Sequence, residues 1–74
     1  MSYAYRLNET TVTDEDGETY TVYGIEAVDE SGNILESFHD IFFDRAKAEE
    51  FVDSCNKYEV LLIHLADVVE DAIS

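Results

Sequence analysis

The stretch Thr19–Val28, T-Y-T-V-Y-G-I-E-A-V, most constrains what this 74-residue chain can fold into. It is rich in β-branched and aromatic residues, and turn-forming pairs flank it, Asp16-Gly17 before it and Ser31-Gly32 after it. This composition predicts a strand in the middle of a small sheet. A chain this short buries only about 60% of its unfolded surface, so every other element has to pair with this strand or pack on it.

Residues 3–13 predict a neighbouring strand whose alternation of apolar side chains changes phase. Leu7 belongs to a run on odd positions, whereas Val12 belongs to a run on even positions. We interpret the change as a β-bulge at Asn8-Glu9, because a bulge returns both runs to one face. A two-residue Asp-Gly turn then sets Val12 opposite Thr21. The predicted core face carries Tyr5, Leu7, Val12, Tyr23, Ile25 and Ala27.

A second turn, over residues 29–33, leads into a third strand that is predicted to run from Ile34 to about Phe38. Ile34 and Phe38 share one side of this strand, and we expect that side to face the core. Gly24 lies inside the central strand, where glycine is unfavourable. We expect it to make room opposite the bulge or beneath a large neighbour.

Two amphipathic stretches follow the sheet. Asp44 suits a helix N-cap, and a helix over about residues 44–56 is predicted, with Asn56 as a left-handed stop. A second helix is predicted over about residues 62–73, with Ile63 away from its apolar stripe. The two stripes consist of Ala48, Phe51, Val52 and Cys55, and of Leu61, Leu65, Val68, Val69 and Ala72.

Together these elements predict an α+β fold. It is a three-stranded antiparallel meander over residues 3–40, with two C-terminal helices packed on one face. We expect residues 1–74 to form a single domain, because the chain is too short for two cores.

The charge is the unusual bulk property of the chain. Eighteen acidic residues stand against four basic ones, which gives a net charge of −14. Such a surface repels nucleic acid and anionic membranes, so we expect neither as a direct partner. A lone cysteine, no apolar leader after Met1 and no long apolar run predict a cytoplasmic protein.

Three side chains are candidates for ligand or thiol chemistry, namely His39, Cys55 and His64. They match no zinc-ligand spacing, and they lie in different predicted elements. We expect Cys55 to be a small core residue and His64 to be a partly buried histidine bonded to a backbone carbonyl or to Asp67. The sequence therefore predicts no catalytic residue, no cofactor and no metal, and we expect that the protein is not an enzyme.

The acidic turn Asp14–Glu18 resembles a cation-binding loop at first sight. It does not fit an EF-hand, because placing Gly17 at the sixth loop position puts Val12 at the first ligand position. We expect a hairpin turn that keeps the sheet soluble, with weak surface binding of calcium as the alternative.

Several short segments carry a resemblance to a known family. They are Y-G-I at Tyr23–Ile25, D-I-F-F-D at Asp40–Asp44, C-N at Cys55-Asn56 and I-H-L-A-D-V-V-E-D at Ile63–Asp71. In that order they resemble a family of short, acidic, uncharacterised proteins of Gram-positive anaerobic bacteria, a domain of unknown function. That family has a proline just before the Ile-His-Leu, where this chain has Leu62, so the start of the last helix is in question. The resemblance implies a bacterial cytosolic protein and supplies no activity.

The leading functional hypothesis is a non-enzymatic protein-interaction module that uses an acidic surface or an apolar sheet face. One alternative is an acidic nucleic-acid mimic that inhibits a DNA- or RNA-binding protein. A second, from another class, is a small metal or thiol enzyme built on His39, Cys55 or His64.

Some apolar residues have no evident place in a single core and predict a contact surface. Tyr20, Val22 and Val28 share the outward side of the central strand, and Ile63 projects from the last helix. Apolar surface of this kind usually marks an interaction site. We expect a protein partner or a second copy of the chain in a homodimer.

Overall fold

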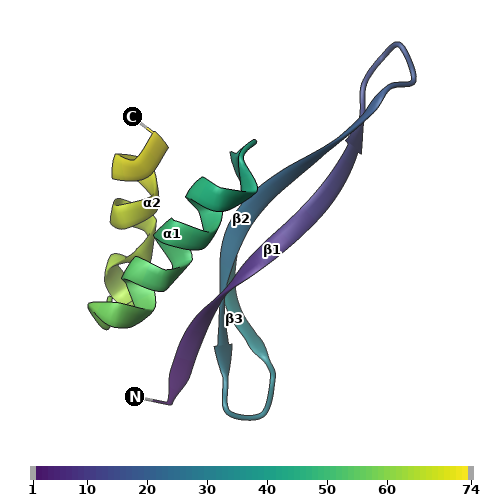
Figure 1. Ribbon diagram of the computed structural model, residues 1–74. Helices are drawn as coiled ribbons and strands as arrows, with labels where there is room; N and C mark the ends of the chain where they lie inside the picture. The colour runs from purple at the N-terminus through teal and green to yellow at the C-terminus, as the bar shows by residue number, and fades with distance from the viewer. Residues whose placement is uncertain (1, 74) are drawn as a thin grey trace.

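The computed structural model describes residues 2–73, which form three strands, two α-helices and a short 3-10 helix (Figure 1). The sheet is antiparallel in the order β1-β2-β3, and α1 and α2 lie on the same side of it. The predicted α+β fold is therefore confirmed. The elements are β1 (Tyr3–Thr13), β2 (Thr19–Asp29), β3 (Ile34–Phe42), α1 (Arg45–Lys57), η1 (Leu62–His64) and α2 (Leu65–Ile73).

The core lies between the helices and one face of the sheet, which we call the core face; the opposite face is the back face. Ile25, Ala27 and Leu65 are fully buried in this core. Burial of a large apolar side chain such as Ile25 or Leu65 contributes on the order of 1.5–3 kcal/mol, which a small chain needs to offset the entropy of ordering. The buried cluster consists of Tyr5, Ile25, Ala27, Val52, Cys55, Leu65 and Val69.

The predicted bulge at Asn8-Glu9 is wrong. The register of β1 and β2 is regular from Tyr3 opposite Asp29 to Thr13 opposite Thr19. Leu7 lies opposite Ile25 as predicted, but Val12 lies opposite Tyr20 instead of Thr21. Val12 therefore lies on the back face, and Leu7 lies on the core face.

The extra residue that the bulge was meant to absorb lies in the turn. The N–H of Asp14 donates to the carbonyl of Glu18 (2.9 Å), and the N–H of Gly17 donates to the carbonyl of Asp14 (3.1 Å). With Gly17 at φ 81°, this is a three-residue loop that ends in a left-handed glycine. The second hairpin repeats it with Asp29 and Gly32, so both turns share the pattern D-E-x-G.

Strand β3 is the irregular strand of the sheet. Its register with β2 shifts twice, once between Tyr23 and Ile25 and once between Ala27 and Val28. The second shift sets Ile34 opposite Val28, on the back face, so Ile34 is 56% exposed. The expectation that Ile34 faces the core with Phe38 is therefore wrong for Ile34, whereas Phe38 packs against the core.

Gly24 lies beside the first of these irregular stretches. A Cβ at this position would lie 1.9 Å from the carbonyl oxygen of Phe38 and 2.8 Å from Oδ1 of Asn8. Asn8 lies opposite Gly24, and its Nδ2 donates to that same carbonyl across the glycine (3.3 Å). Gly24 therefore does not make room opposite a bulge in β1, which is absent, but for the backbone of β3 at Phe38.

Helix α1 lies within one residue of its predicted bounds, whereas the last helix begins later than predicted and ends where predicted. The carboxylate of Asp44 accepts the N–H of Ala46 (3.0 Å), which confirms the N-cap. Asn56 lies inside α1 instead of stopping it, and the left-handed residue is Glu59, at φ 49°. The last helix begins at Leu65, after a 3-10 turn that leaves Ile63 82% exposed.

We predict that Gly24→Ala destabilises the chain by at least about 3 kcal/mol, because the new methyl group would overlap a backbone oxygen. Gly17→Ala is the matched control: it meets no atom within 4 Å, so only its left-handed backbone opposes the change, at about 1–2 kcal/mol. Urea unfolding of the three proteins measures both free energies. A Gly24 variant no less stable than the Gly17 variant would contradict the close approach.

Candidate functional site

The three candidate ligand residues lie in separate parts of the fold. His39 is exposed on β3, Cys55 is buried in α1, and His64 is exposed in η1. The expectation of a partly buried His64 is therefore wrong, because the 3-10 turn leaves its side chain at the surface. Within residues 2–73, no group of three or more histidine, cysteine or acidic side chains is arranged to hold a metal ion. The structure therefore does not bring these residues together into one site.

Cys55 behaves as a core residue. Its side chain is 2% exposed, and it belongs to the buried cluster between α1 and the sheet. Burial raises the pKa of the thiol, so the reactive thiolate is disfavoured at neutral pH. This environment is the opposite of the electropositive, accessible one that activates a cysteine nucleophile.

His39 lies on the back face, between two hydroxyl groups. Its Nδ1 is 3.4 Å from Oγ1 of Thr10 on β1, and its Nε2 is 3.3 Å from Oγ of Ser37 on its own strand. The ring thus reaches from β3 toward β1 over β2, next to the position where Gly24 has no side chain. These contacts fit a polar bridge across the sheet.

An aromatic pair is the most prominent feature of the back face. The rings of Tyr20 and Phe43 lie 6.2 Å apart, and the two side chains are 44% and 76% exposed. Phe43 directly precedes the N-cap Asp44, a position whose apolar side chain usually packs on the first turn of the helix. Here it points to solvent instead, and the sequence pattern alone did not single it out.

The other residues predicted for a contact surface have different environments. Val22 follows Tyr20 on the same face of β2, but its side chain is 1% exposed, so Val22 is not available to a partner. Val28 is half-buried on that face. Ile63 is strongly exposed, but it lies in η1, on the helical side of the molecule. Tyr20 is thus the predicted residue that remains exposed on the back face.

The acidic turns use their leading carboxylates to hold the backbone. Oδ1 of Asp14 accepts the N–H groups of Asp16 and Glu18, each at 2.9 Å. Oδ1 of Asp29 does the same for Ser31 and Asn33, and these bonds, led by that of Asn33, lower the pKa of Asp29. The turns are therefore ordered by their own hydrogen bonds, as expected of hairpin turns.

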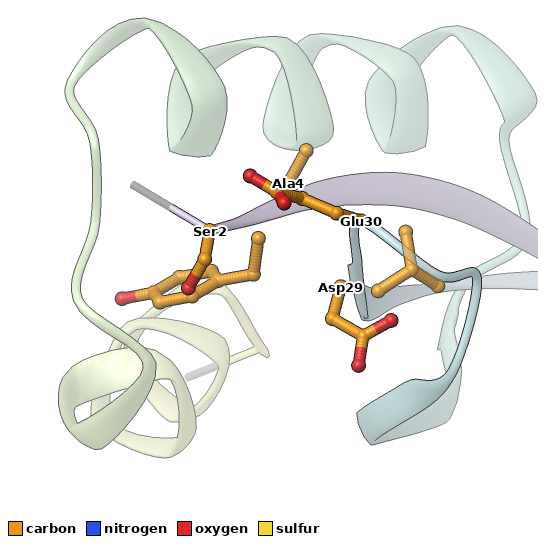
Figure 2. Close-up of a pocket in the computed structure, with 6 residues that line it drawn as sticks. Ser2, Ala4, Asp29 and Glu30 are labelled. Atoms are coloured by element: carbon orange, nitrogen blue, oxygen red, sulfur yellow. The ribbon is translucent and has the colours of Figure 1, made fainter.

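Shallow depressions lie around the start of β1. One of about 180 Å³ is lined by Ser2, Tyr3, Ala4, Val28, Asp29 and Glu30, and Figure 2 shows Ser2 and Ala4 beside Asp29 and Glu30. Its charged lining groups are two carboxylates, and no histidine, cysteine or basic side chain lines it.

The backbone of β1 is bonded to a side chain of α1 at Tyr5. The N–H of Tyr5 donates to Oδ1 of Asn56, and Nδ2 of Asn56 donates to the carbonyl of Tyr5, both at 2.9 Å. The amide of Asn56 therefore pairs with Tyr5 as a peptide group of a neighbouring strand would. Sequence reasoning missed this role because an asparagine near a helix end is more often a stop.

Two of the four basic residues are paired with acidic side chains. Arg6 binds Glu26 across the back face at 2.6 Å, and Arg45 binds Glu9 and Glu49. Most of the acidic residues have no such pairing among the ion pairs of residues 2–73. The surface therefore carries a strongly negative potential.

We predict that the thiol of Cys55 reacts with iodoacetamide at pH 8 about a hundredfold or more slowly in the folded chain than in urea, because reaction needs an opening of the core. The matched control is Ser54→Cys in a Cys55→Ala background, which puts a thiol at the preceding position of α1, where the side chain is exposed. If Cys55 reacted as fast as the thiol at position 54, the buried environment would be wrong.

The comparisons with known proteins give one kind of match. No curated protein and no solved structure matches the chain. A protein-family model described as a family of unknown function matches residues 1–74, the whole chain. This agrees with the uncharacterised family expected from the short motifs, and it supplies no activity to carry over. The chain belongs to the family of unknown function DUF6514.

Proposed function

We propose that the chain is a non-enzymatic protein-interaction module that binds its partner through the back face of the sheet. The observation that carries the proposal is the exposure of Phe43, whose large aromatic side chain is 76% exposed. Phenylalanine is among the residues most often buried, and its burial would stabilise a small core. It packs against Tyr20, so the two rings form one apolar patch. Aromatic anchors of this kind dominate the binding energy of protein interfaces.

The surroundings of this patch favour a protein partner. Tyr20 lies two residues after the acidic turn Asp14–Glu18, and Asp44 directly follows Phe43. An apolar centre with a charged rim is the usual anatomy of a protein interface. The net charge of −14 opposes nucleic acid and anionic lipid and favours a partner whose contacting surface is basic.

The chemistry of the candidate side chains supports a binding role. His39, Cys55 and His64 lie in different elements, and the cysteine is buried with a raised pKa. A catalytic site needs its acid, base or nucleophile within hydrogen-bond reach of one substrate. The contacts of His39 and the burial of Cys55 favour structural roles for these two residues.

We predict that Phe43→Ser reduces retention of the partner about tenfold or more in pull-downs from cell lysate, because the exposed ring is the anchor. The matched control is Tyr58→Ser, since Tyr58 is an equally exposed aromatic residue (71%) at the end of α1. A bound protein that the Tyr58 variant retains and the Phe43 variant loses supports the proposal. Equal retention by both variants contradicts it.

The identity of the retained protein decides among the alternatives. A nucleic-acid-binding protein that is released by added polyanion and does not respond to Phe43→Ser supports the nucleic-acid mimic. Retention of a tagged second copy of the chain, sensitive to Phe43→Ser, supports the homodimer. Sedimentation at several concentrations in physiological salt tests self-association independently.

A further inference from the structure

We propose that the outer edge of β1, from Leu7 to Thr13, binds an extended basic segment of a protein partner as a fourth strand of the sheet. This inference rests on the proposed function and names its partner chemistry. Addition of a strand to an exposed sheet edge is a recurrent mode of peptide recognition, in which backbone hydrogen bonds supply affinity. We call this stretch the β1 edge.

The direction of the backbone groups along the β1 edge follows from two bonds. Tyr5 uses its N–H and carbonyl for Asn56, outside the sheet, whereas Asp14 uses its N–H for Glu18, across the hairpin. In a regular antiparallel ladder, alternate residues point the same way. Odd residues of β1 therefore point outward, and after Tyr5 these are Leu7, Glu9, Thr11 and Thr13.

The β1 edge lacks the features that normally protect a sheet edge. Such edges are usually interrupted by proline, lysine or bulges. Residues 7–13 read L-N-E-T-T-V-T, without proline or lysine, and their register with β2 is regular. Their one charge, on Glu9, is paired with Arg45 of α1. Residues 7–13 therefore carry none of these three interruptions.

The opposite edge of the sheet differs in this respect. Strand β3 shifts register twice, and Asp40 within it has a left-handed backbone with φ 59°. Such irregularities bend an edge and break its row of donors and acceptors. The β1 edge is therefore the one suited to strand addition within residues 2–73.

One position on the outer edge of β1 is already paired with a group that resembles a peptide of a neighbouring strand. The amide of Asn56 makes both bonds of a neighbouring peptide group to Tyr5, and α1 ends one residue later. This contact occupies the outward position just before the β1 edge. A bound strand would continue the pairing that Asn56 begins.

The negative charge beside the β1 edge favours a basic segment as the bound strand. The β1 edge runs directly into the exposed acidic turn, whose four carboxylates belong to Asp14, Glu15, Asp16 and Glu18. Lysine or arginine near one end of the bound segment would lie beside these carboxylates. A second copy would instead bring another net charge of −14 to the same place.

We predict that a labelled peptide of alternating lysine and valine, as long as the β1 edge, binds the full chain with a Kd of about 1 mM or tighter. The matching glutamate-valine peptide should bind at least about tenfold more weakly, because its charge opposes that of the acidic turn. Fluorescence anisotropy in physiological salt measures both. Equal binding of the two peptides, or no binding of the basic one, would overturn the proposal.

The edge itself is tested with Thr11→Pro. Proline removes the outward N–H of Thr11 and leaves the ladder to β2 in place, as prolines in natural edge strands do. It should weaken the basic peptide about tenfold or more, whereas Thr11→Ala, which keeps the N–H, should change the affinity less than about twofold. Circular dichroism shows whether each variant folds.

A second measurement does not depend on the folding of a variant. The basic peptide with N-methyl groups on every residue keeps its charge and loses the N–H donors of both its edges, so it should bind about tenfold more weakly. Full binding of the methylated peptide would overturn the edge geometry.

The outcomes separate this proposal from the proposed function. If Phe43→Ser abolishes peptide binding while Thr11→Pro and methylation do not, the back face is the site and the edge inference is wrong. If Thr11→Pro and methylation weaken binding while Phe43→Ser does not, the edge binds independently of the aromatic patch. The lysate experiment with the Phe43 variant then tests the back face separately.

Discussion

Tyr5 holds the helical layer to the sheet, and the rest of the structure depends on that attachment. Its ring is buried in the core, its N–H and carbonyl are bonded to Asn56 of α1, and its hydroxyl donates to the carbonyl of Val60. Burial, together with the neighbouring Tyr3, raises the pKa of Tyr5 to about 12, so the phenol remains a donor throughout the neutral range. One residue near the start of the chain thus fixes both α1 and the segment that leads to α2.

The same attachment determines what the fold leaves open. The helices lie along only part of the sheet, and the β1–β2 hairpin extends well beyond them, which makes the molecule elongated, 44 × 28 × 19 Å (Figure 1). Asn56 completes the outer edge of β1 at Tyr5 and nowhere farther along. Phe43 lies on the uncovered back face, and the β1 edge runs from Leu7, beside the core, into the projecting hairpin. A short chain that covers one side of its sheet with two helices has little left to cover the other side.

The order of the elements was predictable because local signals agree with the fold. The β-branched run of β2, the N-cap Asp44 and the apolar stripes each indicate one element, and the structure confirms them. The register was only partly predictable. The pairing of Leu7 with Ile25 was correct, but alternation alone does not show whether an extra residue lies in a strand or in a turn. The role of Asn56 was missed because it depends on a contact with Tyr5, which is distant in sequence. The role of Phe43 was missed because its side chain does not make the local contact with the first helical turn that its position predicts.

The most direct test of the open edge is the pattern of amide hydrogen exchange along β1 in the dilute free chain. The outward amides of Leu7, Glu9 and Thr11 should exchange rapidly, whereas the even-numbered amides between them should be protected by their bonds to β2. The amide of Tyr5 should be protected in the native chain and lose that protection in Asn56→Ala, because its acceptor is removed. Uniform protection of Leu7, Glu9 and Thr11 at the level of their neighbours would show that the edge is already occupied and would contradict the account.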